Sequence, residues 1–117
     1  MKTFKEIEFK EGTGKYASTV GMYLPGRVWV LKPTVGFAWA FAQRGLNAKD
    51  GESILTTASL YGLEKWRQLK MRRRFPLGRC IKYFVTEGML PLRELNPGKG
   101  GTRKYIRVQP SNLENQA

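Results

Sequence analysis

The segment from Leu77 to Glu87 constrains the fold of this chain more than any other. At about 100° per residue, its apolar side chains fall on one narrow face of a helix, namely Leu77, Ile81, Phe84 and Val85. The opposite face carries Arg79, Lys82, Tyr83 and Thr86, with no acidic residue among them. We therefore expect a helix that buries one side in a core and presents hydrogen-bond donors on the other.

Proline and glycine residues mark the expected ends of the helices in this half of the chain. Pro76 is permitted in a first turn and Gly88 is suited to the position after a last turn, so the helix is expected to run from Pro76 to Gly88. A preceding helix is expected from about Leu63 to Arg73, broken by Phe75-Pro76. Asp50 is a good N-cap for a first short helix that carries Ile54, Leu55 and Ala58 and ends at Gly62.

The N-terminal part has the pattern of short strands. Residues 6–9 alternate polar and apolar side chains, and so do residues 19–24. Leu24-Pro25-Gly26-Arg27 fits a type II turn that leads into the β-rich run 27–31, so a hairpin is expected here. Residues 34–45 fit either a strand or a helix, and Pro33 before them and Gly45 after them favour the helix.

The charge of the chain is strongly basic and unevenly distributed. The 117 residues include 21 Lys and Arg against 9 Asp and Glu, a formal net charge of +12. This points to a polyanionic partner, with nucleic acid ahead of an anionic membrane. Residues 65–86 contain no acidic residue and eight basic ones, namely Lys65, Arg67, Lys70, Arg72, Arg73, Arg74, Arg79 and Lys82.

Composition excludes several classes of catalytic and metal site. Without histidine there is no Ser-His-Asp or Cys-His site, and Cys80 alone forms neither an internal disulfide nor a cysteine-based zinc site. Asp50 is the one aspartate, and no pair of carboxylates is placed for acid–base work. No signal peptide is apparent, and the longest apolar stretch, Val35–Ala42, is too short to span a bilayer. We expect a cytoplasmic, non-enzymatic protein without cofactor or metal and without membrane association.

The last part of the chain has the pattern of a β-hairpin. Residues 89–95 lead into the turn-rich segment 96–101, after which residues 102–108 alternate. Lys104, Ile106 and Val108 fall on one side of this strand, and Arg103, Tyr105 and Arg107 on the other. The tip is rich in glycine and basic residues. The polar tail 110–117 is expected to be flexible.

Three helices followed by a hairpin with a basic tip resemble the winged helix-turn-helix superfamily over about residues 50–108. The residues that carry the resemblance are the amphipathic helix 77–87, its end at Gly88-Met89-Leu90 and the wing-like segment 96–108. No particular family within the superfamily is indicated, and Pro91, placed in the first wing strand, departs from the pattern. The expected architecture is α+β, a single basic domain over residues 1–109. It has a β-rich N-terminal part (1–46), a hairpin or small sheet, before the winged-helix-like part.

The resemblance implies an interface with duplex DNA. The groove-facing residues would be Arg79, Lys82, Tyr83 and Thr86, with Arg79 in the first turn of its helix, the end that usually approaches the bases. Lys99, Arg103 and Lys104 on the wing would contact phosphates or the adjacent minor groove. Arg72, Arg73 and Arg74 would hold the flanking backbone. They would also suit a helix C-terminus, where the helix dipole favours cations. Lys65, Arg67 and Lys70 complete the basic surface.

Three functions are compatible with this surface. The first is a DNA-binding regulator or a replication or recombination accessory factor, of a size and charge typical of phage or mobile-element proteins, with residues 16–46 available for a homodimer interface. The second is an RNA-binding or ribosome-associated protein, in which exposed aromatics (Tyr16, Tyr23, Trp29, Tyr83 or Tyr105) stack on unpaired bases. The third is a module or inhibitor that docks on an acidic or nucleic-acid-binding surface of a protein partner. Trp29, Trp39, Trp66 and Cys80 are expected in the core.

Overall fold

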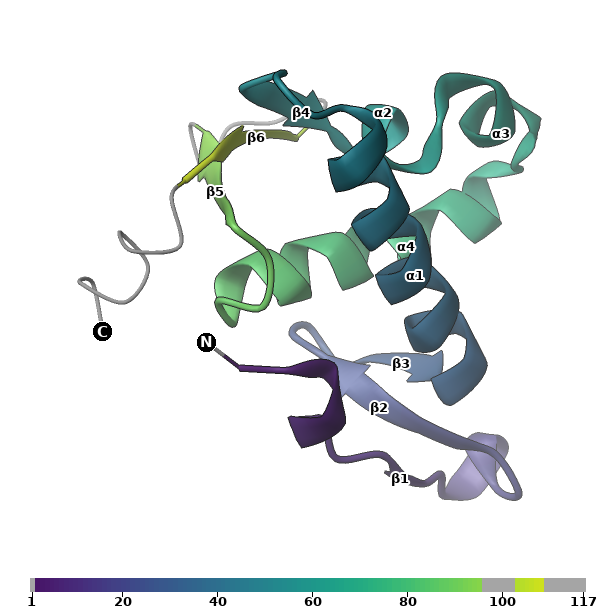
Figure 1. Cartoon of the computed structure of the whole chain (residues 1–117). Coiled ribbons are helices and arrows are strands. Elements are labelled where there is room, and N and C mark those ends of the chain that lie inside the picture. Colours follow the sequence, from purple (N-terminus) through teal and green to yellow (C-terminus); the bar gives the residue numbers. More distant parts are fainter. Residues whose placement is uncertain (1, 96–102, 109–117) are drawn as a thin grey trace.

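The computed structural model describes residues 2–95 and 103–108, and these form a mixed α+β fold (Figure 1). Within them lie four α-helices and two small antiparallel sheets. The first sheet, sheet A, contains β1 (Lys10–Glu11), β2 (Val20–Leu24) and β3 (Val28–Leu31) in the order β1-β2-β3. The second, sheet B, contains β4 (Ile54–Thr56), β5 (Leu92–Leu95) and β6 (Lys104–Arg107) in the order β4-β6-β5.

Sheet A confirms the N-terminal hairpin expected from the alternating pattern. Leu24 pairs with Val28 and Gly21 with Leu31. The connecting turn has positive φ at Gly26 (87°) and also at Arg27 (61°). The segment before it differs from the prediction, because residues 4–6 form a short 3-10 helix and only Lys10–Glu11 pair with β2.

Helix α1 (Lys32–Ala48) settles the ambiguous segment 34–45 as a helix. Pro33 lies in its first turn, as expected. Gly45 does not end the helix but is buried within it. A Cβ at this position would collide with the backbone carbonyl of Leu60. The glycine therefore permits the close packing of α1 on α2 (Thr57–Tyr61).

The expected first helix with Asp50 as its N-cap is wrong. Ile54 and Leu55 belong to β4, where Leu55 pairs with Tyr105 fifty residues later in the chain. The helix begins only at Thr57. Its cap is Thr56, whose side chain accepts a hydrogen bond from the backbone N–H of Ser59 while the Ser59 hydroxyl accepts one from the N–H of Thr56. Gly62, at φ 94°, ends α2 as predicted.

The expected boundary between the next two helices is also wrong. Helix α3 (Leu63–Gln68) is shorter than predicted, and α4 (Met71–Thr86) begins five residues before Pro76. The carbonyl of Lys70 accepts hydrogen bonds from the N–H groups of Arg73 and Arg74, so the first turn forms ahead of the proline. Arg72, Arg73 and Arg74 therefore lie at the N-terminus of a helix rather than at a C-terminus.

The end of α4 is as predicted. Gly88 has φ 70° and donates to the Val85 carbonyl at 3.1 Å, while the N–H of Met89 donates to the Phe84 carbonyl at 2.8 Å. This pair of bonds is a Schellman motif. Pro91 lies just before β5 rather than inside the strand, and its carbonyl accepts from the N–H of Val108.

One hydrophobic core joins both sheets to the helices. Leu77, Cys80, Ile81 and Phe84 of α4 are buried and contact the buried face of α1 and Leu92 of β5 in a single cluster, which also includes Met22 and Leu24 of β2. Val85, predicted in the core, is half-buried and packs against it. The opposite side of α4 is exposed at Met71, Phe75 and Thr86 and half-buried at Arg79 and Lys82.

Candidate nucleic-acid interface

The outer face of α4 carries a stripe of side chains at helical spacing. Met71, Phe75, Arg79, Lys82 and Thr86 follow one another by three or four residues and so share one face. Met71 and Phe75 are exposed to 73% and 49%, unusual for large apolar residues. They were missed from the sequence because the helix was predicted to begin at Pro76. Arg79, in consequence, lies in the middle of α4 and not in its first turn.

Phe75 and Arg79 act as a pair, one turn apart. The guanidinium of Arg79 lies over the Phe75 ring, 5.0 Å from its centroid. The ring holds the guanidinium without consuming its hydrogen-bond donors, because a cation–π contact is made through the face of the group. Arg79 forms no side-chain hydrogen bond or ion pair with the described residues, so its N–H groups can donate to an acceptor on a ligand.

The arginines at the start of α4 lie where the helix dipole disfavours positive charge. No acidic residue is present in the first turn, and Arg72 and Arg73 are exposed. Cations at a helix N-terminus are unfavourable, by up to about 1 kcal/mol each when exposed. The dipole therefore does not explain these residues, although it would have explained them at the predicted C-terminus.

Arg74 has a structural role. Its Nε donates to the Trp66 carbonyl at 3.1 Å and its Nη2 to the Arg67 carbonyl at 3.2 Å, and the guanidinium lies 5.6 Å from the Trp66 ring centroid. These carbonyls belong to the last turn of α3, and that of Trp66 also accepts from the N–H of Leu69 at 3.2 Å. Arg74 therefore links α4 to α3, and its Nε and Nη2 donors are used within the protein.

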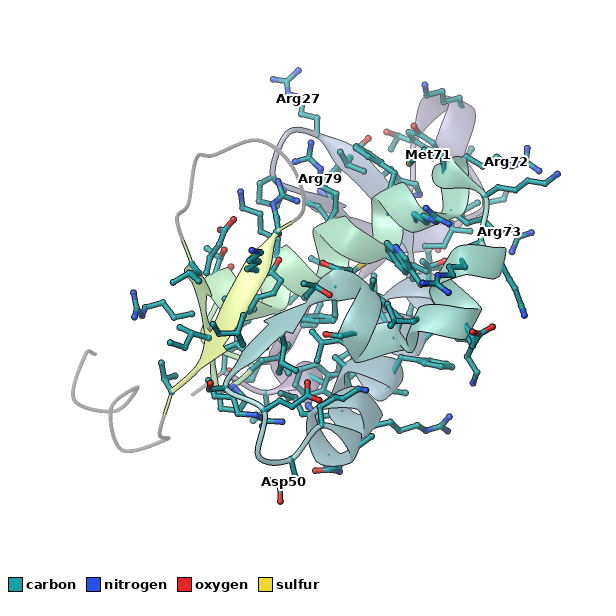
Figure 2. All side chains as sticks on the ribbon, turned by 90° about the horizontal axis from the view of Figure 1, so that it is seen from above. Arg27, Asp50, Met71, Arg72, Arg73 and Arg79 are labelled. Carbon is teal, nitrogen blue, oxygen red and sulfur yellow. The ribbon has the colours of Figure 1, made fainter. Side chains whose placement is uncertain are left out.

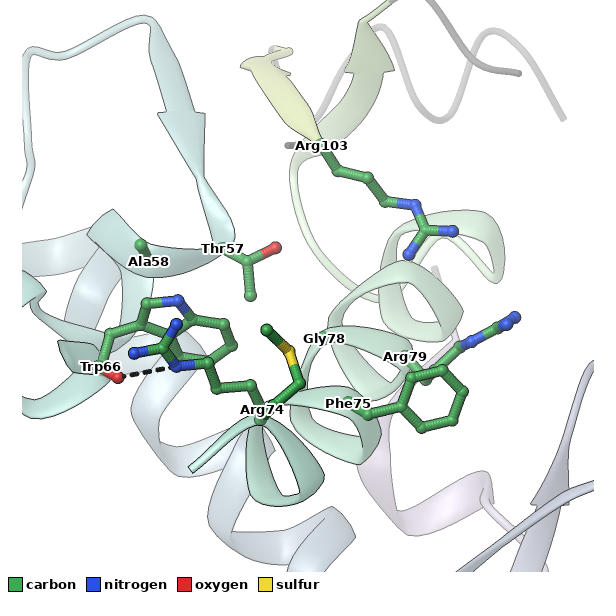
Figure 3. Close-up of a pocket in the computed structure, with 9 residues that line it drawn as sticks. Thr57, Ala58, Trp66, Arg74, Phe75, Gly78, Arg79 and Arg103 are labelled. Atoms are coloured by element: carbon green, nitrogen blue, oxygen red, sulfur yellow. Dashed lines mark hydrogen bonds between the residues drawn. The ribbon is translucent and has the colours of Figure 1, made fainter. Parts of the chain in front are cut away.

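A hollow of about 550 Å³ lies beside the stripe (Figure 3). Gly78 lines the hollow, and a Cβ there would meet only the Thr57 methyl, at 4.0 Å. Three guanidinium groups line the hollow or its edge, those of Arg74, Arg79 and Arg103. The remaining lining comes from Thr57, Ala58, Trp66, Met71 and Phe75. The hollow thus combines positive charge with apolar and aromatic walls.

The wing contributes less than predicted within the described residues. Arg103 forms an ion pair with Glu94 (Nε to Oε1, 3.6 Å), and Lys104 at the start of β6 is exposed. Lys99 and the predicted glycine-rich tip lie outside the described residues. Arg103 nevertheless reaches the hollow beside Arg79, so β6 and α4 share one basic surface.

Several predicted residues lie away from the stripe or on its border. The Nζ of Lys65 lies 4.7 Å from the ring centroid of Phe41 on α1, and Arg67 is exposed on α3. Lys70 is the exposed N-cap residue of α4. Tyr83 is half-buried, and its hydroxyl accepts a hydrogen bond from the Nζ of Lys2 at 3.2 Å. It therefore borders the N-terminal segment instead of facing outward.

The aromatic predictions hold unevenly. Tyr105 is fully buried, so its proposed role in base stacking is wrong. Trp39 and Trp66 are partly buried against the core, whereas Trp29 stacks on Tyr16 (5.6 Å between centroids) on the surface of sheet A. Cys80 is fully buried as predicted, and burial raises the pKa of its thiol to about 12.

Two arginines were not predicted as functional. Arg107 of β6 donates to the carbonyls of Leu46, Lys49 and Glu52 at 2.6–2.8 Å, so it closes the end of α1. Arg27, in the β2–β3 turn, is exposed and lies on the same side of the molecule as Arg79 (Figure 2). Neither role has a sequence signal, because each depends on segments brought together by tertiary packing.

Within residues 2–95 and 103–108, no group of three or more Cys, Asp or Glu side chains is placed to hold a metal ion. None of the helices in those ranges is both long and apolar enough to cross a bilayer. Comparison of the chain with protein-family models, curated proteins and solved structures gives no match.

Proposed function

We propose that this protein binds duplex DNA through a winged helix-turn-helix, with α4 as its recognition helix. The proposed correspondence begins at α1, earlier than the sequence pattern indicates: α1, β4, α2, α4 and the β5–β6 hairpin are the successive elements, and α3 is a short insertion before α4. The sheet order β4-β6-β5 supports this, since the first strand pairs with the returning arm of the hairpin.

The observation that carries the proposal is the outer face of α4. Arg79 and Lys82 lie on that face, and Arg72 and Arg73 lie at the N-terminal end of the same helix, beside Thr34 and Phe37 of α1. Residues 71–86 of the helix contain no acidic residue, and Arg72 and Arg73 lower its stability where they lie. The presence of two arginines that destabilise a helix end is explained if they bind a polyanion. A helix fits the major groove, which is about 12 Å wide.

The chemistry of the stripe suits the edges of base pairs. A guanidinium can donate to the O6 and N7 acceptors of guanine, and an apolar ring can contact the methyl group of thymine. Arg79 and Phe75 would supply these two contacts side by side, while Arg72, Arg73, Lys82 and Lys104 would meet phosphates. Neutralising these four phosphates would give a slope of roughly −4 for log affinity against log salt concentration.

The test is a competition among duplex DNA, single-stranded DNA and structured RNA, measured by fluorescence anisotropy at about 150 mM salt, where non-specific electrostatic binding is weak. The duplex is drawn from a pool enriched for binding from random sequence. The proposal predicts that the enriched duplex competes best. Equal and weak competition by all three would refute it.

A second candidate, binding of single-stranded nucleic acid, is favoured by the surface of sheet A. The Trp29 ring contacts those of both Tyr16 and Tyr23 there. Tyr23 is exposed to 44%, and the Nζ of Lys10 lies 5.5 Å from its ring centroid. Aromatic side chains beside cations can stack unpaired bases. In the competition this candidate predicts the opposite order, with single strands ahead of duplex.

The biological role that fits the proposal is a small regulator or a replication or recombination accessory factor. A homodimer would bind two half-sites about one helical turn apart. The footprint of the enriched duplex tests this point, because a dimer predicts an inverted or direct repeat and a monomer predicts a single half-site.

A further inference from the structure

Two β-hairpins border α4, namely the β5–β6 hairpin, which is the proposed wing, and the β2–β3 hairpin. Sheet B packs on α4 through β5, and sheet A packs on it through β2, from the other side of the helix (Figure 1). The β2–β3 turn comes close to the stripe, because a Cβ built on Gly26 would lie 3.9 Å from the Nη1 of Arg79. The turn therefore adjoins the stripe on α4 that is proposed to contact the bases.

Arg27 occupies a backbone conformation that ordinary side chains avoid. Its φ is 61°, and the one other non-glycine residue with positive φ in the described ranges is Ser18, at 69°. The left-handed region is unfavourable for a residue with a Cβ, and hairpin loops of three residues usually carry glycine at such a position. An arginine is thus kept where glycine would relieve strain, which points to a use for its side chain.

The charge of the turn has no partner of its own. Arg27 is exposed and forms no ion pair or side-chain hydrogen bond with the residues the structure describes. Residues 12–49 contain no acidic residue, so none flanks the turn in sequence. Figure 2 shows the Arg27 side chain extending outward on the side where Arg79 lies. An anion that meets Arg79 from outside would also come within the field of Arg27.

We propose that the β2–β3 turn is a second wing, in which Arg27 binds a DNA backbone phosphate beside the groove that receives α4, on the side away from the β5–β6 hairpin. The inference rests on the proposed function. It adds a phosphate contact from sheet A, so the N-terminal part belongs to the interface.

The test compares Arg27→Gly with Ser18→Gly on the enriched duplex. Both variants relieve a positive φ, so both are expected to keep or raise the thermal midpoint, but only the first removes a charge. We expect Arg27→Gly to raise Kd about threefold to tenfold at 150 mM salt and to reduce the magnitude of the salt slope by about 0.9, as for one lost phosphate contact. Ser18→Gly should change neither quantity.

A third variant, Arg27→Lys, keeps the charge and the strain and should restore most of the salt slope. If Arg27→Gly binds like Ser18→Gly while Arg79→Ala still weakens binding, the second wing is refuted and the proposed function stands. If the wild-type protein fails to prefer duplex, the proposed function falls and the second wing falls with it.

Discussion

The hydroxyl groups of two buried tyrosines meet different surroundings. Tyr61 donates to the Leu77 carbonyl at 3.1 Å, which ties α2 to α4. The Tyr105 hydroxyl is buried beside the Thr57 side chain but has no hydrogen bond of good geometry among the described residues. Burial raises the pKa of both, that of Tyr105 to about 12, so both are neutral at physiological pH.

Replacing each tyrosine with phenylalanine should therefore have unequal effects. Tyr61→Phe loses a buried hydrogen bond, while the Leu77 carbonyl stays within the helical ladder of α4, and the variant should lower the free energy of unfolding by about 1 kcal/mol. Tyr105→Phe removes a group that gains no bond and should be neutral or slightly stabilising. Urea denaturation of the two variants measures the difference. Equal losses would contradict the assignment of the two hydroxyls.

The thiol of Cys80 offers a second prediction for a single residue. It is fully buried on α4, and its pKa is raised by burial to about 12. At pH 8 the reactive thiolate is then a fraction of about 10⁻⁴, and the reagent has no access to it. We expect no reaction with an aromatic disulfide reagent in buffer and complete reaction of one thiol in denaturant. Rapid labelling of the folded protein would show that this part of α4 opens.

At the scale of elements, two glycines inside helices predict opposite effects of alanine. Gly78 of α4 borders open space, so Gly78→Ala should raise the free energy of unfolding by about 0.5–1 kcal/mol through helix propensity. Gly45 of α1 lies against the Leu60 backbone, so Gly45→Ala must push α1 and α2 apart and should destabilise. Thermal denaturation gives both signs. A shared sign would contradict the packing of α1 on α2.

Arg107 predicts a link between β6 and the end of α1. The last turn of α1 contains no basic residue of its own, and Arg107 donates to three carbonyls at or just beyond it. Arg107→Ala should lower the free energy of unfolding by about 2 kcal/mol, since three bonds from a charged donor are lost, although the Lys49 carbonyl keeps the N–H of Glu52. Denaturant unfolding measures this, with Arg93→Ala, an exposed residue of β5, as the control expected to cost little.

The elements that the sequence pattern predicted well depend on local signals. The buried face of α4, its end at Gly88 and the β2–β3 hairpin all follow from spacing and turn residues within a few positions. β4 was missed because a strand of three residues has almost no pattern of its own and pairs with β6 across the chain. The start of α4 differs from the prediction because the pattern favours Pro76 as a first-turn residue, whereas the helix begins at Met71 and includes the proline. Met71 and Phe75 therefore lie outside the helix that the pattern predicts and outside its candidate site.

At the scale of the whole molecule, a single core predicts a single unfolding transition. Residues of sheet A, the helices and sheet B belong to one hydrophobic cluster, with no separate core for the N-terminal part. Tryptophan fluorescence, which includes Trp29 on sheet A and Trp66 on α3, should report the same denaturation midpoint as far-UV circular dichroism. Two separated midpoints would show that sheet A folds as an independent unit.

The central claim, that the outer face of α4 binds duplex DNA, is tested most directly by one pair of arginine variants. Arg79 and Arg44 each make a cation–π contact with a phenylalanine. The guanidinium of Arg79 lies 5.0 Å from the ring centroid of Phe75, and that of Arg44 lies 5.4 Å from the ring centroid of Phe41. Alanine at either position therefore removes the same charge and the same type of contact, but Arg44 is exposed on α1, away from the stripe.

The measurement is the Kd of each variant for the enriched duplex at about 150 mM salt, with folding checked by circular dichroism. A lost bidentate base contact is worth about 1–3 kcal/mol, so Arg79→Ala should raise Kd by roughly fivefold or more, whereas Arg44→Ala should stay within about twofold of wild type. Equal effects of the two variants, or a wild-type-like Arg79→Ala, would contradict the account.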